Sequence, residues 1–298
     1  MPRTRLRARA ALLFSTLIWG TSFVIGQRAL ADLPVFHLMA FRFAIALLLL
    51  LPLARGIDWR RPGILRDGAL LGVLLFAGFA LQSYGLLGTT PSRSAFLTGL
   101  SVVMVPFLAV LLGRTVKPGP AVGSAIAAAG LWVLFRPASG SPESLGSAGF
   151  TWGDGLTLAS ALVFAVYVLA VEAAVRRQPV RALAIVQFGL IGLLAAPSLL
   201  LHPPVRAEFT PYALFAILVL GVLATAVAFL GHLYAQRHLT AVEAGVIFSL
   251  EPVFAAAFSV ALGVERWSLN LALGGALVVA AMLTTELWGG AEGVTPPT

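Results

Sequence analysis

Residues 211–235 read PYALFAILVLGVLATAVAFLGHLYA, a run of 25 residues without an Asp, Glu, Lys or Arg. A helix of about 20 mostly apolar residues is long enough to cross the hydrocarbon core of a bilayer. The chain contains ten such apolar runs, each bounded by charges, Pro or Gly. We therefore expect ten transmembrane helices, at 9–27, 34–54, 66–87, 92–112, 118–136, 152–174, 182–201, 211–235, 241–263 and 267–288.

The composition indicates the same class of protein. Of the 298 residues, 59% are hydrophobic and 11% are charged, whereas soluble globular chains have about 45–50% apolar and about 25% charged residues. This excludes a water-soluble core of this size, and we predict an all-α polytopic protein of the bacterial inner membrane. The chain has no cysteine, which excludes disulfides, zinc–thiolate sites and thiol catalysis. We expect neither a cofactor nor a metal.

The positive charges are distributed as topology signals. The net charge is +8, but Lys and Arg lie in short runs between apolar segments, and not on one solvated face as nucleic-acid binding requires. Of the 20 Lys and Arg, fourteen fall in one set of alternate connections, five fall in the other, and Arg42 lies inside a span. The positive-inside rule therefore predicts that both termini are cytoplasmic. The Arg-rich start imitates a signal peptide, but we expect it to lead into the first helix.

An internal repeat relates the two halves of the chain. A shift of 145 residues superposes Phe43 on Phe188, and a shift of 150 superposes Tyr84 on Tyr234. Each repeat has five spans, an odd number, so the second enters the membrane from the opposite side, as in many secondary transporters. We expect a first repeat at 1–136, a connecting loop at 137–150, a second repeat at 151–288 and a disordered tail at 289–298.

Five short motifs resemble those of the drug/metabolite transporter superfamily, in its EamA-type ten-helix branch. They are 17–22 (LIWGTS), 41–43 (FRF), 90–98 (TPSRSAFLT), 250–254 (LEPVF) and 263–266 (GVER). The resemblance implies a 5+5 inverted repeat around a central cavity, formed by spans one to four and six to nine, with spans five and ten behind it. It also implies transport of small metabolites, often amino acids or amphipathic compounds and commonly outward.

The sequence thus predicts a secondary active transporter, an exporter that works by alternating access on a small-molecule substrate. A passive channel or uniporter and a membrane-embedded enzyme are the alternatives. The chain has no Gly-rich loop ending in Gly-Lys, no His-Glu-x-x-His and no Gly-x-Ser-x-Gly, so the usual motifs for ATP-driven and hydrolytic chemistry are missing. Residues 152–155 (WGDG) superficially resemble an intramembrane aspartyl motif, but Asp154 has no partner Asp. We do not expect an enzyme.

Two ionisable residues lie deep in predicted spans, Arg42 about eight residues into its run and Glu251 about ten. A charge at the bilayer centre costs about 2.5–3.5 kcal/mol on insertion scales, so such residues are functional candidates. Arg42 is a candidate for substrate binding and Glu251 for proton coupling, and a structural ion pair between them is the alternative. The repeat places Gln187 opposite Arg42 and Ser101 opposite Glu251.

Each half also has a proline in the span that contains Ser101 or Glu251. Pro252 follows Glu251 and lacks a backbone N–H, which loosens a helix, and Pro106 does the same in the first half. The family's usual Glu-Pro signature appears only in the second half, because the first half reads Val105-Pro106. Symmetric coupling by two carboxylates is therefore not expected.

Polar and aromatic residues complete the predicted cavity. Interfacial belts are the alternative for Tyr84 and Tyr234, helix packing is the alternative for Trp19, and a structural hydrogen bond is the alternative for His232. The predicted cavity residues are Trp19, Arg42, Gln82, Tyr84, Phe96, Thr98, Ser101, Tyr167, Gln187, His232 and Tyr234.

Spans five and ten carry small residues that would let helices approach closely in lipid. We expect these residues to serve packing, and a homodimer through the same faces is possible. They are Gly119, Gly123, Ala127 and Gly130 in span five, and Gly274, Gly275 and Ala280 in span ten.

Overall fold

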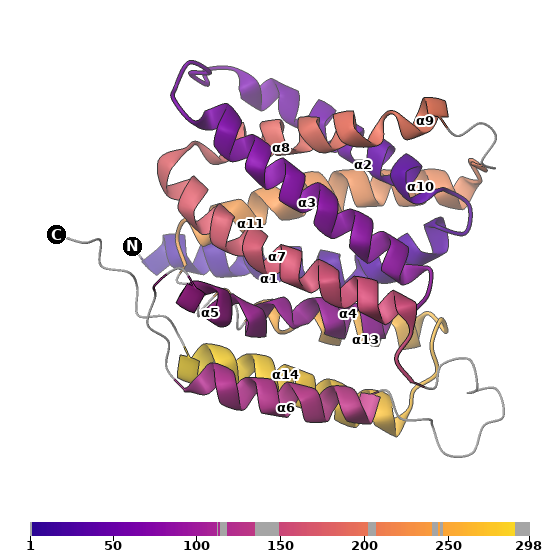
Figure 1. The fold of residues 1–298 in the computed structure, drawn as a ribbon. Coiled ribbons are helices and arrows are strands. Elements are labelled where there is room, and N and C mark those ends of the chain that lie inside the picture. Colours follow the sequence, from indigo (N-terminus) through magenta and orange to yellow (C-terminus); the bar gives the residue numbers. More distant parts are fainter. Residues whose placement is uncertain are drawn as a thin grey trace.

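The computed structural model describes residues 2–111, 113, 118–134, 149–201, 207–239, 244 and 247–289. Most of the predicted connecting loop and of the predicted disordered tail lies outside these residues. The described part of the chain contains helices and no strand (Figure 1). The first half comprises α1 (Pro2–Ala29), α2 (Val35–Leu50), η1 (Leu51–Ala54), α3 (Ile64–Leu86), α4 (Pro91–Gly99), α5 (Ser101–Leu111) and α6 (Gly119–Leu134). The second half comprises α7 (Trp152–Arg177), α8 (Val180–Ala195), α9 (Ser198–Leu201), α10 (Pro211–Val219), the π-helix η3 (Leu220–Val227), α11 (Ala228–Gln236), α13 (Glu251–Ala261) and α14 (Leu269–Gly289).

These helices identify the chain as a polytopic membrane protein. Within the described residues, seven helical segments are long and apolar enough to cross a bilayer. Three shorter apolar helices, Val122–Leu134, Glu251–Ala261 and Leu269–Thr285, accompany them. Together, these ten segments overlap the ten transmembrane helices predicted from the sequence. Large apolar side chains also face outward, for example Leu111 at 82% exposure and Leu200 at 80%, as expected of a surface that contacts lipid tails.

The fourth and ninth predicted spans are not continuous helices. In the fourth span, α4 ends at Gly99 and α5 begins at Ser101. In the ninth, a turn at residues 249–250 precedes α13, which begins at Glu251. The predicted depth of Glu251, about ten residues into the ninth span, stays a prediction, and the structure places Glu251 at the first position of α13. The physical reason is Pro252, because proline has no N–H to donate and is favoured in the first turn of a helix.

The packing of the helices repeats between the halves. In the first half α3 packs on α7 and α8, and in the second half the segment formed by η3 and α11 packs on α1 and α2. In the same way α4 and α5 pack on α7, while α13 packs on α1. The pairs α2 with α8, α4 with α13 and α6 with α14 join equivalent spans. Exchanging the halves therefore reproduces the contacts, as a two-fold relation requires.

Spans five and ten form a pair at one side of the bundle, where Figure 1 shows α6 and α14 side by side. A Cβ atom added at Gly274 would lie 2.8 Å from the Leu134 nitrogen and 2.9 Å from the Gly130 oxygen. The two backbones thus approach as closely as glycine allows. Gly123 likewise faces Ala281 and Thr285 of α14. The predicted small-residue faces are used within one chain, and the homodimer stays a prediction.

Candidate substrate site

Repeat-equivalent aromatic residues meet at the centre of the bundle. Phe43 of α2 and its equivalent Phe188 of α8 have ring centroids 5.6 Å apart. Phe79 of α3 and its equivalent Phe229 of α11 have centroids 6.1 Å apart. Residues related by a two-fold rotation can touch each other only at the rotation axis. These two pairs therefore mark the axis that relates the halves.

Arg42 lies beside this axis, and no carboxylate of the described residues pairs with it. Its side chain is buried, and Nε donates a hydrogen bond to Thr225 Oγ1 at 2.9 Å. The guanidinium carbon lies 4.5 Å from the centroid of the Phe79 ring and 5.4 Å from that of Phe43, which is cation–π geometry. Nη2 is buried and has no hydrogen-bond partner. Among the ion pairs of the described residues, none joins Arg42 to Glu251, so the structural pair given as the alternative is not seen.

A small cavity opens next to Arg42. It lies between α1, α2, α3 and η3, and the centre of a water molecule can move within about 20 Å³ of it. That volume holds about one water molecule, so the site is nearly closed in this conformation. Its lining consists of Ser22, Phe23, Gly26, Leu30, Leu38, Arg42, Phe79, Gln82, Ser83, Leu86 and Leu220.

Gln82 extends the polar group toward α4. Its Nε2 donates to Thr98 Oγ1 at 3.1 Å. Gln82 lines the cavity and Thr98 is buried. Three of the predicted cavity residues, Arg42, Gln82 and Thr98, therefore gather on the first-half side of the axis.

Four other predicted residues gather on the second-half side. The Tyr167 hydroxyl donates to Gln187 Oε1 at 3.0 Å, and both side chains are buried. The His232 ring lies 5.3 Å from the Trp19 ring and 6.4 Å from the Tyr167 ring, measured between centroids. Trp19 Nε1 donates to the Ala224 carbonyl at 2.8 Å. This carbonyl belongs to the π-helix η3, whose irregular backbone is typical of functional segments.

The remaining predicted residues have other surroundings. Phe96 is buried against Gly275 of α14, Tyr84 is 38% exposed and packs on Phe36, and Tyr234 packs on His238. Ser101 and Glu251 stand at the first positions of α5 and α13. These residues lie outside the two groups described above, so the cavity role of Phe96, Tyr84, Tyr234 and Ser101 stays a prediction. The coupling role of Glu251 also stays a prediction.

Sequence reasoning missed a buried polar cluster at one end of the bundle. Arg93, which we counted as a connecting charge, donates through Nη2 to Asp154 Oδ2 at 2.7 Å, with side-chain exposures of 8% and 0%. Asp154 also accepts from Thr89 and from the Thr151 nitrogen, and it closes a capping box at the start of α7. Residues 152–155 are thus the first turn of a capped helix. The Thr-x-x-Asp spacing is the signal that could have predicted this cap.

Glu265 adds a second acidic group at the same end. Its Oε2 accepts hydrogen bonds from Ser92 and Ser259. Ser92 is adjacent to Arg93 at the start of α4, so the cluster ties α4 to α7 and to the connection after α13. These contacts hold α4, α7 and the connection after α13 together at the end of the bundle where the cavity residues Leu30 and Leu86 lie.

A bundle of apolar spans with a two-fold axis and a buried charge beside it defines a multi-pass membrane transporter. The chain belongs to the EamA-like transporter family, whose model matches residues 7–136 and 151–286. This confirms the family resemblance seen in the sequence.

Relatives from Archaeoglobus fulgidus are similar along nearly the whole chain. One protein, named an uncharacterized transporter, is 30% identical over 284 residues, which cover 95% of this chain and 87% of the relative. A second protein of the same description is 27% identical, with coverage of 92% and 95%. A solved crystal structure of a protein aligns with a TM-score of 0.68 at 22% identity, over 94% of this chain and 97% of the other. This likeness confirms the fold.

Proposed function

We propose that the protein is a secondary active transporter that exports small metabolites, such as amino acids or amphipathic compounds, across the bacterial inner membrane. The observation that carries the proposal is the polar and aromatic group around the axis, where Arg42 lacks a counter-charge and contacts a nearly closed cavity. Intramembrane charges of this kind are typical of substrate pathways. Equivalent halves around a central site are typical of alternating access.

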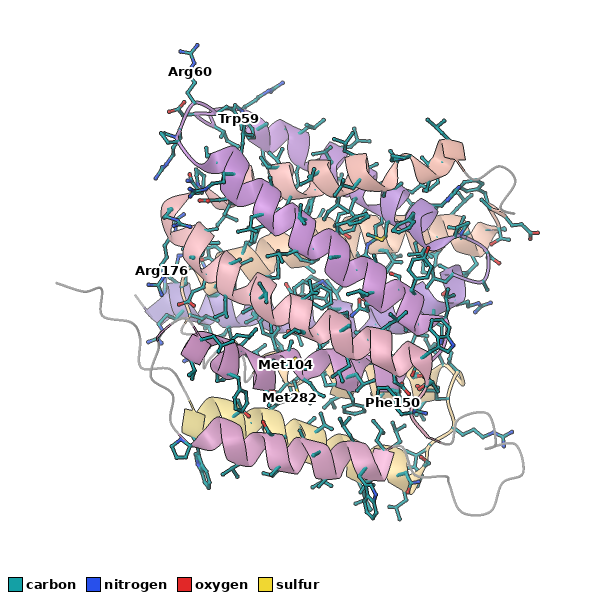
Figure 2. All side chains as sticks on the ribbon, viewed as in Figure 1. Trp59, Arg60, Met104, Phe150, Arg176 and Met282 are labelled. Carbon is teal, nitrogen blue, oxygen red and sulfur yellow. The ribbon has the colours of Figure 1, made fainter. Side chains whose placement is uncertain are left out.

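The proposed topology is inverted, with both termini in the cytoplasm. Arg61 donates to the carbonyl of Arg177 at 2.6 Å, which brings two Arg-rich connections together. Arg93 donates to the carbonyl of Gly149 at 2.6 Å, which joins two connections of the other set. Figure 2 shows Arg60 and Arg176 at one end of the helices and Phe150 toward the opposite end. This segregation supports the orientation indicated by the Lys and Arg count.

The proposed coupling site is Glu251. It is partly exposed, it begins α13, and Pro252 follows it. A helix N-terminus favours a carboxylate, while a bilayer interior favours the neutral acid. These opposing effects suit a group that binds and releases a proton during the cycle.

Flux in proteoliposomes tests the proposal. The purified chain is reconstituted, a proton gradient is imposed, and the uptake of radiolabelled amino acids and amphipathic compounds is measured. We expect accumulation above the equilibrium level for at least one compound, and its loss when a protonophore dissipates the gradient. Equilibration without accumulation would indicate the channel or uniporter, and chemical conversion without flux would indicate an enzyme.

A further inference from the structure

The two sides of the axis carry the same arrangement with different side chains. The offset of 145 pairs Ser22 with Tyr167 and Arg42 with Gln187, and the offset of 150 pairs Gln82 with His232. The contacts follow this correspondence. Trp19 meets Phe229 with ring centroids 5.0 Å apart, and their equivalents Phe164 and Phe79 meet at 5.8 Å. One side can therefore be used to interpret the other.

On the second-half side, the position beside the axis is filled by the chain itself. The aromatic ring of Tyr167 occupies it, with 2% of the residue exposed, and its hydroxyl hydrogen-bonds to Gln187. The Tyr167 hydroxyl thus bonds the amide oxygen of Gln187, whereas the buried Gln187 Nε2 has no hydrogen-bond partner.

On the first-half side, no aromatic side chain fills the same position, and a nearly closed cavity lies there. Ser22 replaces the tyrosine, and its Oγ donates to the Trp19 carbonyl of its own helix at 2.7 Å. The cavity lies between Ser22 and Arg42, and Nη2 of Arg42 has no partner. Phe23 and Phe79 line the cavity, and Gln82 and Ser83 add polar groups.

We infer that the substrate is a small aromatic carboxylate that occupies, on the first-half side, the position held by Tyr167 on the second. This inference rests on the proposed transport function and names its substrate class. The ring would lie against Phe23 and Phe79. The carboxylate would accept hydrogen bonds from Arg42, because a guanidinium binds carboxylates with matched geometry.

The charge of the site sets the charge of the substrate. Among the described residues that line the cavity, Arg42 is the only ionisable one, and a single guanidinium balances one negative charge. A cation would be repelled, and a phosphate dianion would leave one charge unbalanced in a medium of low dielectric constant. The nearly closed cavity must widen to admit a ring, as an alternating-access cycle requires.

Equilibrium binding of radiolabelled benzoate to the purified full chain in detergent tests this inference. We expect saturable binding at pH 7 with at least tenfold weaker affinity for benzamide and for acetate. Arg42→Gln, which installs the residue found at position 187, should weaken benzoate binding at least tenfold and abolish the preference over benzamide. The matched control is Arg28→Gln. It removes an exposed cation that lies over Tyr212 outside the cavity, and it should keep benzoate affinity within twofold.

A second variant imitates the occupied state. Ser22→Tyr should place a phenol ring beside Arg42 and abolish benzoate binding. Wild-type benzoate binding by the folded Ser22→Tyr protein would overturn the inference. So would tighter binding of phenyl phosphate than of benzoate, or equal binding of benzamide. If Ser22→Tyr does not fold, the Arg42→Gln comparison decides.

Failure of this inference differs from failure of the proposed function. Transport is measured separately, with the solute panel in proteoliposomes. Flux of another solute by a protein that does not bind benzoate would overturn the substrate class and leave the transporter. Arg42-dependent benzoate binding without any flux would support the binding site and overturn the proposed transport.

Discussion

The fourth and ninth spans are interrupted at equivalent leucines of similar backbone conformation, but the residues that follow differ in chemistry. Leu100 has φ −61° and ψ −13°, and Leu250 has φ −82° and ψ −16°. A new helix follows each leucine, beginning with Ser101 in the first half and with the acid Glu251 in the second. The comparison teaches that the repeat preserves where the helices break, whereas the residue at the break differs. Of these two positions, only the one in the second half carries a carboxylate that could bind a proton.

The largest effect is expected from replacing Glu251 of the ninth span with serine, the residue at the equivalent position of the fourth span. Glu251→Ser should abolish gradient-driven accumulation in proteoliposomes, because no group remains there to bind a proton, while solute exchange without a gradient continues. Glu251→Asp, which keeps the carboxylate, is the control and should retain accumulation. Full accumulation by the serine variant would assign coupling to another residue.

The next effect concerns the ion pair at one end of the bundle. Asp154→Asn removes the carboxylate that pairs directly with the buried Arg93, and breaking such a pair costs about 3–5 kcal/mol. We expect a large fall in the thermal unfolding temperature in detergent. Glu172→Gln is the matched acid-to-amide control, because Glu172 pairs with the largely exposed Arg176 and exposed pairs contribute about 0–1 kcal/mol. Equal melting temperatures of the two variants would contradict a stabilising role for Asp154.

A smaller effect is expected at the close contact between the equivalent helices α6 and α14. Gly274→Val would press its side chain onto Gly130 and Leu134, and overpacking costs about 1–3 kcal/mol. The unfolding temperature should fall, but the order of preference among transported solutes should not change. A changed preference would place α6 and α14 in the substrate pathway. Gly192→Ala has open space around its added Cβ and serves as the control.

The smallest effect is expected at Trp19. Trp19→Phe installs the residue found at the equivalent position 164 and removes the hydrogen bond to the Ala224 carbonyl. The loss of one such bond costs about 0.5–1.5 kcal/mol, which corresponds to at most about a tenfold change in a ratio of affinities. Competition between two transported solutes measures that ratio. An unchanged ratio with reduced expression would assign Trp19 to packing.

The spans could be predicted from the sequence because hydropathy and length decide them. The breaks could not be placed from proline alone. Pro106 lies inside α5 without interrupting it, whereas Pro252 lies in the first turn of α13. Which of two prolines ends a helix depends on the neighbours that satisfy the freed carbonyls, and a single sequence does not show those neighbours.

The candidate site was predicted in part. Arg42 could be proposed because a charge deep in an apolar span is costly, and Gln187 because the repeat sets it opposite Arg42. Ser22 was missed because a serine in a helix carries no distinctive signal, and its interest arises only from the space beside Arg42. Arg93 was assigned to a connection because its burial against Asp154 depends on tertiary contacts between α4 and α7.

The uncompensated guanidinium of Arg42 has an electrical consequence. A whole elementary charge that crosses the membrane field gains or loses about 2.3 kcal/mol per 100 mV, and a change of access around a fixed charge moves it through part of that field. The empty protein should therefore reorient at a voltage-dependent rate. With a bound monovalent anion the two charges cancel and the dependence should diminish. Charge movements recorded after voltage steps would then be present without solute and suppressed by saturating carboxylate.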